Sequence, residues 1–102
     1  MRSEVNLLAR VRVFDGAEPT KEYALKPLEE AAEVAEAWKA LERSMAGDAP
    51  APRVRAAERA LVDEIADAVQ ALCNLAWAVG CDDLTAAMAR CERRNRERGR
   101  IS

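Results

Sequence analysis

Hydrophobic residues recur at intervals of three and four along most of the chain, which is the spacing of amphipathic helices. The strongest patterns run from about residue 23 to residue 45 and from about residue 53 to residue 79. The first contains Leu28, Ala31, Val34, Trp38, Leu41 and Met45. The second contains Leu61, Ile65, Val69, Leu72 and Ala76. We therefore predict two long helices, each with one apolar stripe, and expect Trp38 and Trp77 in the core, with stacking on a nucleobase as the less favoured alternative.

Glycine, proline and aspartate predict where these helices end and where another begins. Gly47 and Gly80 follow the two patterns, as glycine commonly does at a helix C-terminus. Residues 46–52 contain two prolines and fit a short connection between antiparallel helices. Asp82 or Asp83 is suited to cap one more helix. The apolar face of that helix would comprise Leu84, Ala87, Met88 and Cys91.

The N-terminal region is less clear. Residues 4–14 show helical spacing, although 11–14 fit a short strand equally well, and Asp15-Gly16 then predicts a loop.

We predict an all-α fold, a four-helix bundle forming a single domain over residues 1–102. Because Ala-rich faces on several sides cannot all be buried within one chain, we expect oligomerisation, as a homodimer or homotetramer, to complete the bundle.

Composition narrows the classes of function. The 16 Lys and Arg against 18 Asp and Glu create no basic field, which argues against nucleic acid as a partner. No apolar run approaches the roughly 20 residues of a membrane span, and no signal peptide is evident, so we expect a cytoplasmic protein without membrane association. The three cysteines match no disulfide or metal spacing. Because the chain has no histidine, acid–base or metal chemistry would depend on carboxylates.

Two pairs of acids have the spacing of a metal site. Glu30 and Glu33 lie three apart on the first long helix, and Glu64 and Asp67 repeat this on the second, so each pair shares a face. Four converging carboxylates repel unless they are protonated or share a cation, and oxygen ligands alone suit Mg²⁺. We therefore predict a Mg²⁺ site with a triphosphate as substrate. With 18 acids, such pairs also arise by chance on solvated faces.

Three further polar residues are candidates for substrate binding. Asn74 is the only polar side chain over residues 72–80 and follows Asp67 by two helical turns, and a buried amide needs hydrogen-bond partners. Asn95 and Arg98 continue the apolar face of the last helix, and arginine suits bidentate phosphate contacts. A solvated basic tail explains Arg98 equally well.

The acid pairs belong to a longer pattern that resembles a known family. Glu29-Glu30-Ala31-Ala32-Glu33 and Glu64-Ile65-Ala66-Asp67 resemble the E-E-x-x-E…E-x-x-D signature of MazG-type all-α NTP pyrophosphohydrolases. Other features similar to that family are Asn74, Val79-Gly80 before Asp82-Asp83, and the ending Asn95-Arg96-Glu97-Arg98-Gly99-Arg100-Ile101. The resemblance covers residues 23–101, although the interval between Glu33 and Glu64 slightly exceeds the one usual in the family.

The resemblance implies that Glu30, Glu33, Glu64 and Asp67 bind Mg²⁺. It also implies that Glu30 or Glu33 helps to activate water, and that an NTP or dNTP is hydrolysed to the monophosphate and pyrophosphate. One alternative is a non-catalytic helical interaction module or subunit that binds a partner helix through its apolar faces. A nucleic-acid binder using the arginine-rich C-terminus ranks lower, because it leaves the acid pairs and Asn74 unexplained.

Overall fold

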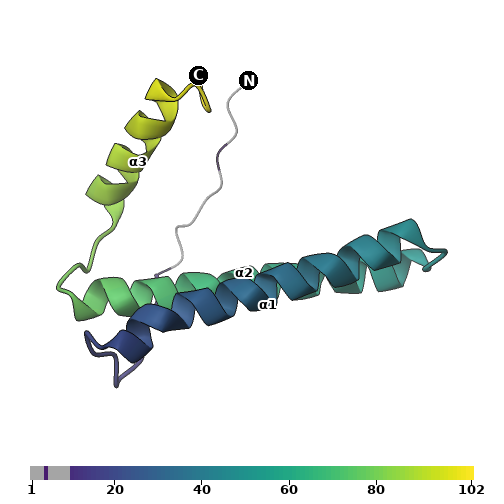
Figure 1. Cartoon of the computed structure of the whole chain (residues 1–102), viewed down its shortest axis with the longest axis horizontal. Coiled ribbons are helices and arrows are strands. Elements are labelled where there is room, and N and C mark those ends of the chain that lie inside the picture. Colours follow the sequence, from purple (N-terminus) through teal and green to yellow (C-terminus); the bar gives the residue numbers. More distant parts are fainter. Residues whose placement is uncertain (1–3, 5–9) are drawn as a thin grey trace.

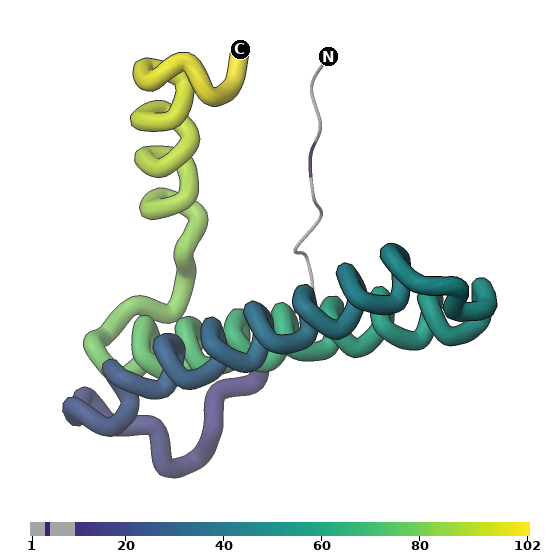
Figure 2. Tube along the Cα trace, turned by 45° about the vertical axis from the view of Figure 1, so that its right-hand side comes forward, coloured from purple at the N-terminus to yellow at the C-terminus, as the bar shows by residue number. Residues whose placement is uncertain are grey.

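The computed structural model describes residue 4 and residues 10–102, which form three helices and no strand. The helices are α1 (Lys21–Ala46), α2 (Ala51–Ala78) and α3 (Thr85–Glu97). α1 and α2 lie antiparallel, side by side along their length, and α3 turns away from this hairpin (Figures 1 and 2). The prediction of an all-α chain is confirmed. None of the described helices has the length and apolarity needed to cross a membrane.

The two long helices begin and end close to the predicted residues. Thr20 caps α1, because its hydroxyl oxygen accepts a hydrogen bond from the Tyr23 N–H at 3.3 Å. Gly47 follows α1, and Gly80 follows α2 with a φ of 94°. This left-handed conformation favours glycine, and it lets the Gly80 N–H donate to the carbonyl of Trp77 at 2.9 Å. Both glycines therefore end the helices as expected.

α3 has no described helix packed against it, and its N-cap is Leu84 and not the predicted Asp82 or Asp83. The carboxylate of Asp83 accepts a hydrogen bond from the Thr85 N–H at 2.9 Å. The chain turns beyond α3 at Gly99, whose φ is 74°. In the described chain α3 contacts neither α1 nor α2. Isolated helices of this length are marginal in water, so α3 lacks the packing that normally stabilises a helix.

The helix predicted over residues 4–14 is not formed in its described part. Residues 4 and 10–14 belong to neither helix nor strand, and the other positions of that predicted helix lie outside the described residues. The backbone of residues 12–14 is instead bonded to α2. The N–H of Phe14 donates to Oδ1 of Asn74, and the carbonyl of Arg12 accepts from Nε2 of Gln70, both at 3.0 Å. The prediction of four helices in one bundle is thus wrong for the described chain.

The core of the chain is small. The buried apolar residues among those described are Ala17, Leu41 and Ala71. Trp38 and Trp77, which we expected in the core, remain 47% and 49% exposed. The reason is geometric, because each helix of a two-helix hairpin turns only one side toward the other. The radius of gyration, 16.5 Å, accordingly exceeds the roughly 13 Å of a compact domain of this length.

Candidate metal centre

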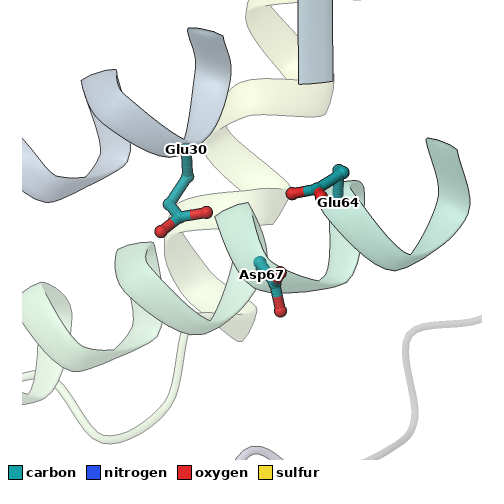
Figure 3. Close-up of side chains that lie close together, drawn as sticks. All are labelled: Glu30, Glu64 and Asp67. Carbon is teal, nitrogen blue, oxygen red and sulfur yellow. The ribbon is translucent and has the colours of Figure 1, made fainter. Parts of the chain in front are cut away.

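Three of the predicted acidic residues form a cluster between the long helices. Glu30 projects from α1 toward α2, which carries Glu64 and Asp67 one turn apart (Figure 3). One carboxylate oxygen from each residue lies within 4.8 Å of the other two. Glu30 and Glu64 are half-buried, and Asp67 is exposed. The antiparallel hairpin thus brings residue 30 beside residues 64–67, as the paired spacing predicts.

The position of Glu30 on α1 explains why it is less exposed than its neighbours. Glu30 precedes the half-buried Val34 by four residues, so it lies in the stripe that faces α2. Glu29 and Glu36 are exposed on another side of the helix and form ion pairs with lysines at 3.0 and 3.2 Å. The prediction that these two acids face solvent is confirmed.

The cluster is electrostatically unfavourable without a proton or a cation. Partial burial raises the pKa of Glu64, and the negative charges of Glu33, Asp67 and Glu30 raise this pKa further. Among the described residues, no lysine or arginine forms an ion pair with Glu30, Glu64 or Asp67. The neighbouring negative charges therefore make ionisation of Glu64 less favourable, whereas the charge of Glu30 is attracted by Lys26.

Glu33 occupies a different place from the other predicted ligands. Its carboxylate lies outside the group of three, and its side chain is exposed one turn beyond Glu30. It is nevertheless close enough to Glu64 to raise the pKa of that residue. The structure thus places Glu33 beside the cluster, within its electrostatic field.

A cavity of about 250 Å³ adjoins the cluster. It is lined by Glu30 and Asp67 together with Phe14, Glu22, Tyr23, Lys26, Gln70, Ala71 and Asn74. Asn74 is only 3% exposed, and its Oδ1 accepts hydrogen bonds from the Phe14 N–H at 3.0 Å and from Nε2 of Gln70 at 2.9 Å. Asn74 thus has the partners that we predicted a buried amide needs. Through them it holds the segment before α1 as a wall of the cavity.

The sequence did not single out Phe14, Tyr23 or Gln70 as residues of this cavity. Gln70 had a usable signal, because it precedes Asn74 by one helical turn and so shares its face. Tyr23 lies in the first turn of α1, seven residues before Glu30 and on the same side. Phe14 had no local signal, because its contact with Asn74 spans 60 positions of the chain.

The other predicted substrate contacts are not brought to the cluster within one chain. Asn95 and Arg98 belong to the end of α3, which contacts neither α1 nor α2. Asn95 instead accepts a hydrogen bond from Nη1 of Arg100 at 3.0 Å and donates to Sγ of Cys91 at 3.4 Å. The side chain of Arg98 is exposed. These contacts tie Asn95 to its own helix and to the tail that follows.

The donor set of the cluster fits Mg²⁺. Carboxylate oxygens are hard ligands, and the group contains neither thiolate nor imidazole, which the common structural zinc sites require. Three carboxylates also leave positions for water and phosphate oxygens, which Mg²⁺ prefers to retain. Comparison of the chain with known families and proteins adds nothing to this: no family model, no curated protein and no solved structure matches it.

Proposed function

We propose that this protein hydrolyses a nucleoside triphosphate to the monophosphate and pyrophosphate in a Mg²⁺-dependent reaction. The observation that carries the proposal is the convergence of Glu30, Glu64 and Asp67 beside a cavity that two of them line. Clustered carboxylates that form no ion pair with lysine or arginine among the described residues are stabilised by a divalent cation, and Mg²⁺ commonly completes its coordination with phosphate oxygens. The resemblance to MazG-type enzymes, which rests on the same residues, supports this substrate class.

Glu30, Glu64 and Asp67 would hold the metal. Bound Mg²⁺ would screen the charge of the polyphosphate and polarise the oxygens of the reacting phosphoryl group. Glu33 is best placed to act as general base, because it is exposed one turn from Glu30 and is not a member of the cluster. It takes a proton as the oxygen of water attacks the α-phosphorus. The bond from that phosphorus to the bridging oxygen breaks, and pyrophosphate leaves.

The cavity would receive part of the nucleotide. Its volume of about 250 Å³ is below the roughly 300–1,000 Å³ of pockets that enclose a drug-sized ligand. Aromatic rings of Phe14 and Tyr23 supply apolar surface for a flat group, and Lys26 supplies a positive charge for phosphate. A metal held by the acids at the edge of the cavity would lie next to this space. We infer that the cavity binds one end of the substrate and leaves the remainder in solvent.

The test follows pyrophosphate release from a panel of NTPs and dNTPs with Mg²⁺. We expect the wild-type chain to hydrolyse at least one of them and a Glu64→Gln, Asp67→Asn variant to lose the activity. The matched control is Glu36→Gln, Glu42→Gln, which removes the same charge from exposed acids of α1 that do not line the cavity and should leave the activity intact. Activity that persists in the first variant, or that is absent from the wild-type chain with every nucleotide, would refute the proposal.

A second candidate is an interaction module without catalytic activity. The observation that favours it is the large apolar surface of the described chain, where Leu28 is 69% exposed and Leu72 is 52% exposed. This candidate predicts that Mg²⁺ neither binds to the cluster nor supports hydrolysis. Calorimetric titration of the wild-type chain with Mg²⁺ alone separates the two, because only the enzyme requires binding that the Glu64→Gln, Asp67→Asn variant loses.

A further inference from the structure

Asn74 and Gln70 form a bonded pair of amides whose orientation is determined by the backbone. The N–H of Phe14 donates to Asn74 at 3.0 Å, so the atom that faces this donor is the carbonyl oxygen Oδ1 and not the amide nitrogen. The same oxygen accepts from Nε2 of Gln70 at 2.9 Å. Nε2 also donates to the carbonyl of Arg12 at 3.0 Å. Both amides are therefore held in one orientation.

Two polar atoms of this amide pair are left for a ligand. Oδ1 of Asn74 already accepts twice and Nε2 of Gln70 already donates twice, which uses their capacity. Among the described residues, Nδ2 of Asn74 and Oε1 of Gln70 form no hydrogen bond. Every buried side-chain nitrogen or oxygen of the described chain has a partner, so these two atoms reach accessible space. Asn74 is 3% exposed, and both residues line the cavity. A ligand in the cavity therefore meets a free donor next to a free acceptor.

The lining of the cavity runs along α2 from the acids to these amides. At 1.5 Å per residue, Gln70 lies about 4.5 Å and Asn74 about 10 Å along the helix from Asp67. A metal held by the acid cluster would bind phosphate oxygens at the acid end. The base is the end of a nucleotide opposite the phosphates, so the amide end of the cavity is placed to receive it. This orientation rests on the proposed function, since only a nucleotide carries both groups.

The charges around the cavity also favour an uncharged group inside it. Among its described lining residues, Glu22, Glu30 and Asp67 are acidic. Lys26 lies in the same lining, but its ammonium is already paired with Glu29 at 3.0 Å. These acids would repel a phosphate that lay beyond the reach of the metal. A base has no net charge and avoids this repulsion.

The aromatic rings of Phe14 and Tyr23 supply surface on which a base can stack. Both residues line the cavity, and neither is fully buried, because Tyr23 is half-buried and Phe14 is 55% exposed. Stacking on an aromatic ring stabilises any base, since every base has a π face, so it supplies affinity with little discrimination. Discrimination between bases therefore depends on the two free amide atoms.

The free donor and acceptor match a base edge on which a ring nitrogen lies next to an amino group. Cytosine has such an edge in N3 and N4, and adenine has one in N1 and N6. We propose that the cavity binds cytosine or adenine, with Nδ2 of Asn74 donating to the ring nitrogen and Oε1 of Gln70 accepting from the amino group. In the same pose, uracil or hypoxanthine would set a carbonyl oxygen against Oε1 and an N–H against Nδ2, which leaves all four groups without a partner. The acids of the lining attract an amino group and repel a carbonyl oxygen, which adds to this preference.

The test titrates the isotope-labelled full chain with nucleosides in the absence of Mg²⁺ and follows the side-chain amide resonances by NMR. Cytidine and uridine form one matched pair, and adenosine and inosine form another, because a carbonyl oxygen replaces the amino group within each pair. We expect cytidine and adenosine to shift the Nδ2 resonance of Asn74 and to bind on the order of 10-fold more tightly than uridine and inosine. No binding of any nucleoside, or equal binding within each pair, would overturn the proposal.

A variant of Gln70 separates selection of the base from support of the cavity. Gln70→Ala removes Oε1 and leaves the Phe14 N–H bonded to Asn74. We expect the preference for cytidine over uridine to fall below about twofold, because the acceptor for the amino group is lost. The matched control is Glu58→Ala, at an exposed position of α2 outside the cavity lining, and it should keep the preference. If Gln70→Ala weakened both nucleosides equally, Gln70 would only support the cavity, and the assigned selection would be wrong.

These measurements need neither Mg²⁺ nor hydrolysis, so they can fail independently of the proposed activity. Hydrolysis of every NTP without preference among bases would leave the proposed function intact and overturn the selection by Asn74 and Gln70. Selective binding of cytidine and adenosine, with no hydrolysis of any nucleotide, would support the base site and refute the proposed function.

Discussion

Replacing Asn74 by alanine tests whether this residue anchors the segment before α1. Its Oδ1 accepts two hydrogen bonds, from the Phe14 N–H and from Nε2 of Gln70, and the side chain is 3% exposed. A hydrogen bond of this kind contributes about 1 kcal/mol net, so the loss of two lowers the free energy of unfolding by about 2 kcal/mol. For a domain of this size, that corresponds to a decrease in Tm of roughly 8–16 °C.

The assay is urea denaturation at one fixed protein concentration, because the stability of an oligomer depends on concentration. Amide exchange at Phe14 is measured in parallel and should accelerate in Asn74→Ala. Gln70→Ala is the control, because it leaves the Phe14 N–H bonded to Asn74 and should keep that amide protected. A loss below about 0.5 kcal/mol in Asn74→Ala, or unchanged exchange at Phe14, would refute the anchoring role.

Three further predictions concern the acid cluster and the helix ends. In chelator-treated protein, Glu64→Gln should raise Tm at pH 7.5. The pKa of Glu64 is higher in the folded than in the unfolded chain, so its deprotonation lowers stability as pH rises, and glutamine avoids this loss. The gain in Tm should vanish as pH falls below the ordinary carboxyl pKa of 4.5. A gain that persisted at that pH would contradict the assignment of the effect to the charge of Glu64. Gly80 has a φ of 94° and no atom within 4 Å of a new Cβ, so Gly80→Ala should lower the free energy of unfolding by about 1 kcal/mol through backbone strain alone. Gly47 has a φ of −96°, so Gly47→Ala should lower it by less than about 0.5 kcal/mol. Urea denaturation measures both changes. Thr20→Ala should lower the free energy of unfolding by about 0.5–1 kcal/mol, and Thr20→Ser, which keeps the capping hydroxyl, by much less. Equal losses in the two variants would exclude a role for the hydroxyl.

The long helices were predictable because their signals are local. An apolar residue every three or four positions and a glycine at the end of a run act over one or two turns, and α1 and α2 follow them within two residues at each end. The segment before α1 was not predictable in this way. Val11 has helical spacing, yet residues 12–14 make hydrogen bonds to Gln70 and Asn74, which no pattern within the segment reveals.

The candidate site was predictable to the extent that helix geometry determines it. The spacing of Glu64 and Asp67, and an antiparallel partner helix with an acid on its inward stripe, suffice to bring three carboxylates together. The positions of Asn95 and Arg98 depend instead on how α3 packs. α3 contacts no other described helix, so its periodicity could not locate these residues relative to the acids.

The acid cluster and the exposure of Ile65 have a common origin in the periodicity of α2. In Glu64-Ile65-Ala66-Asp67, the two acids share a side because they are three apart, and Ile65 points to the far side because it lies two positions before Asp67. A hairpin of two helices has no third helix to cover that far side. The oligomerisation that we expect from the sequence would cover that side. On this reasoning, substitutions of Ile65 should change assembly while the spacing of Glu64 and Asp67 remains intact.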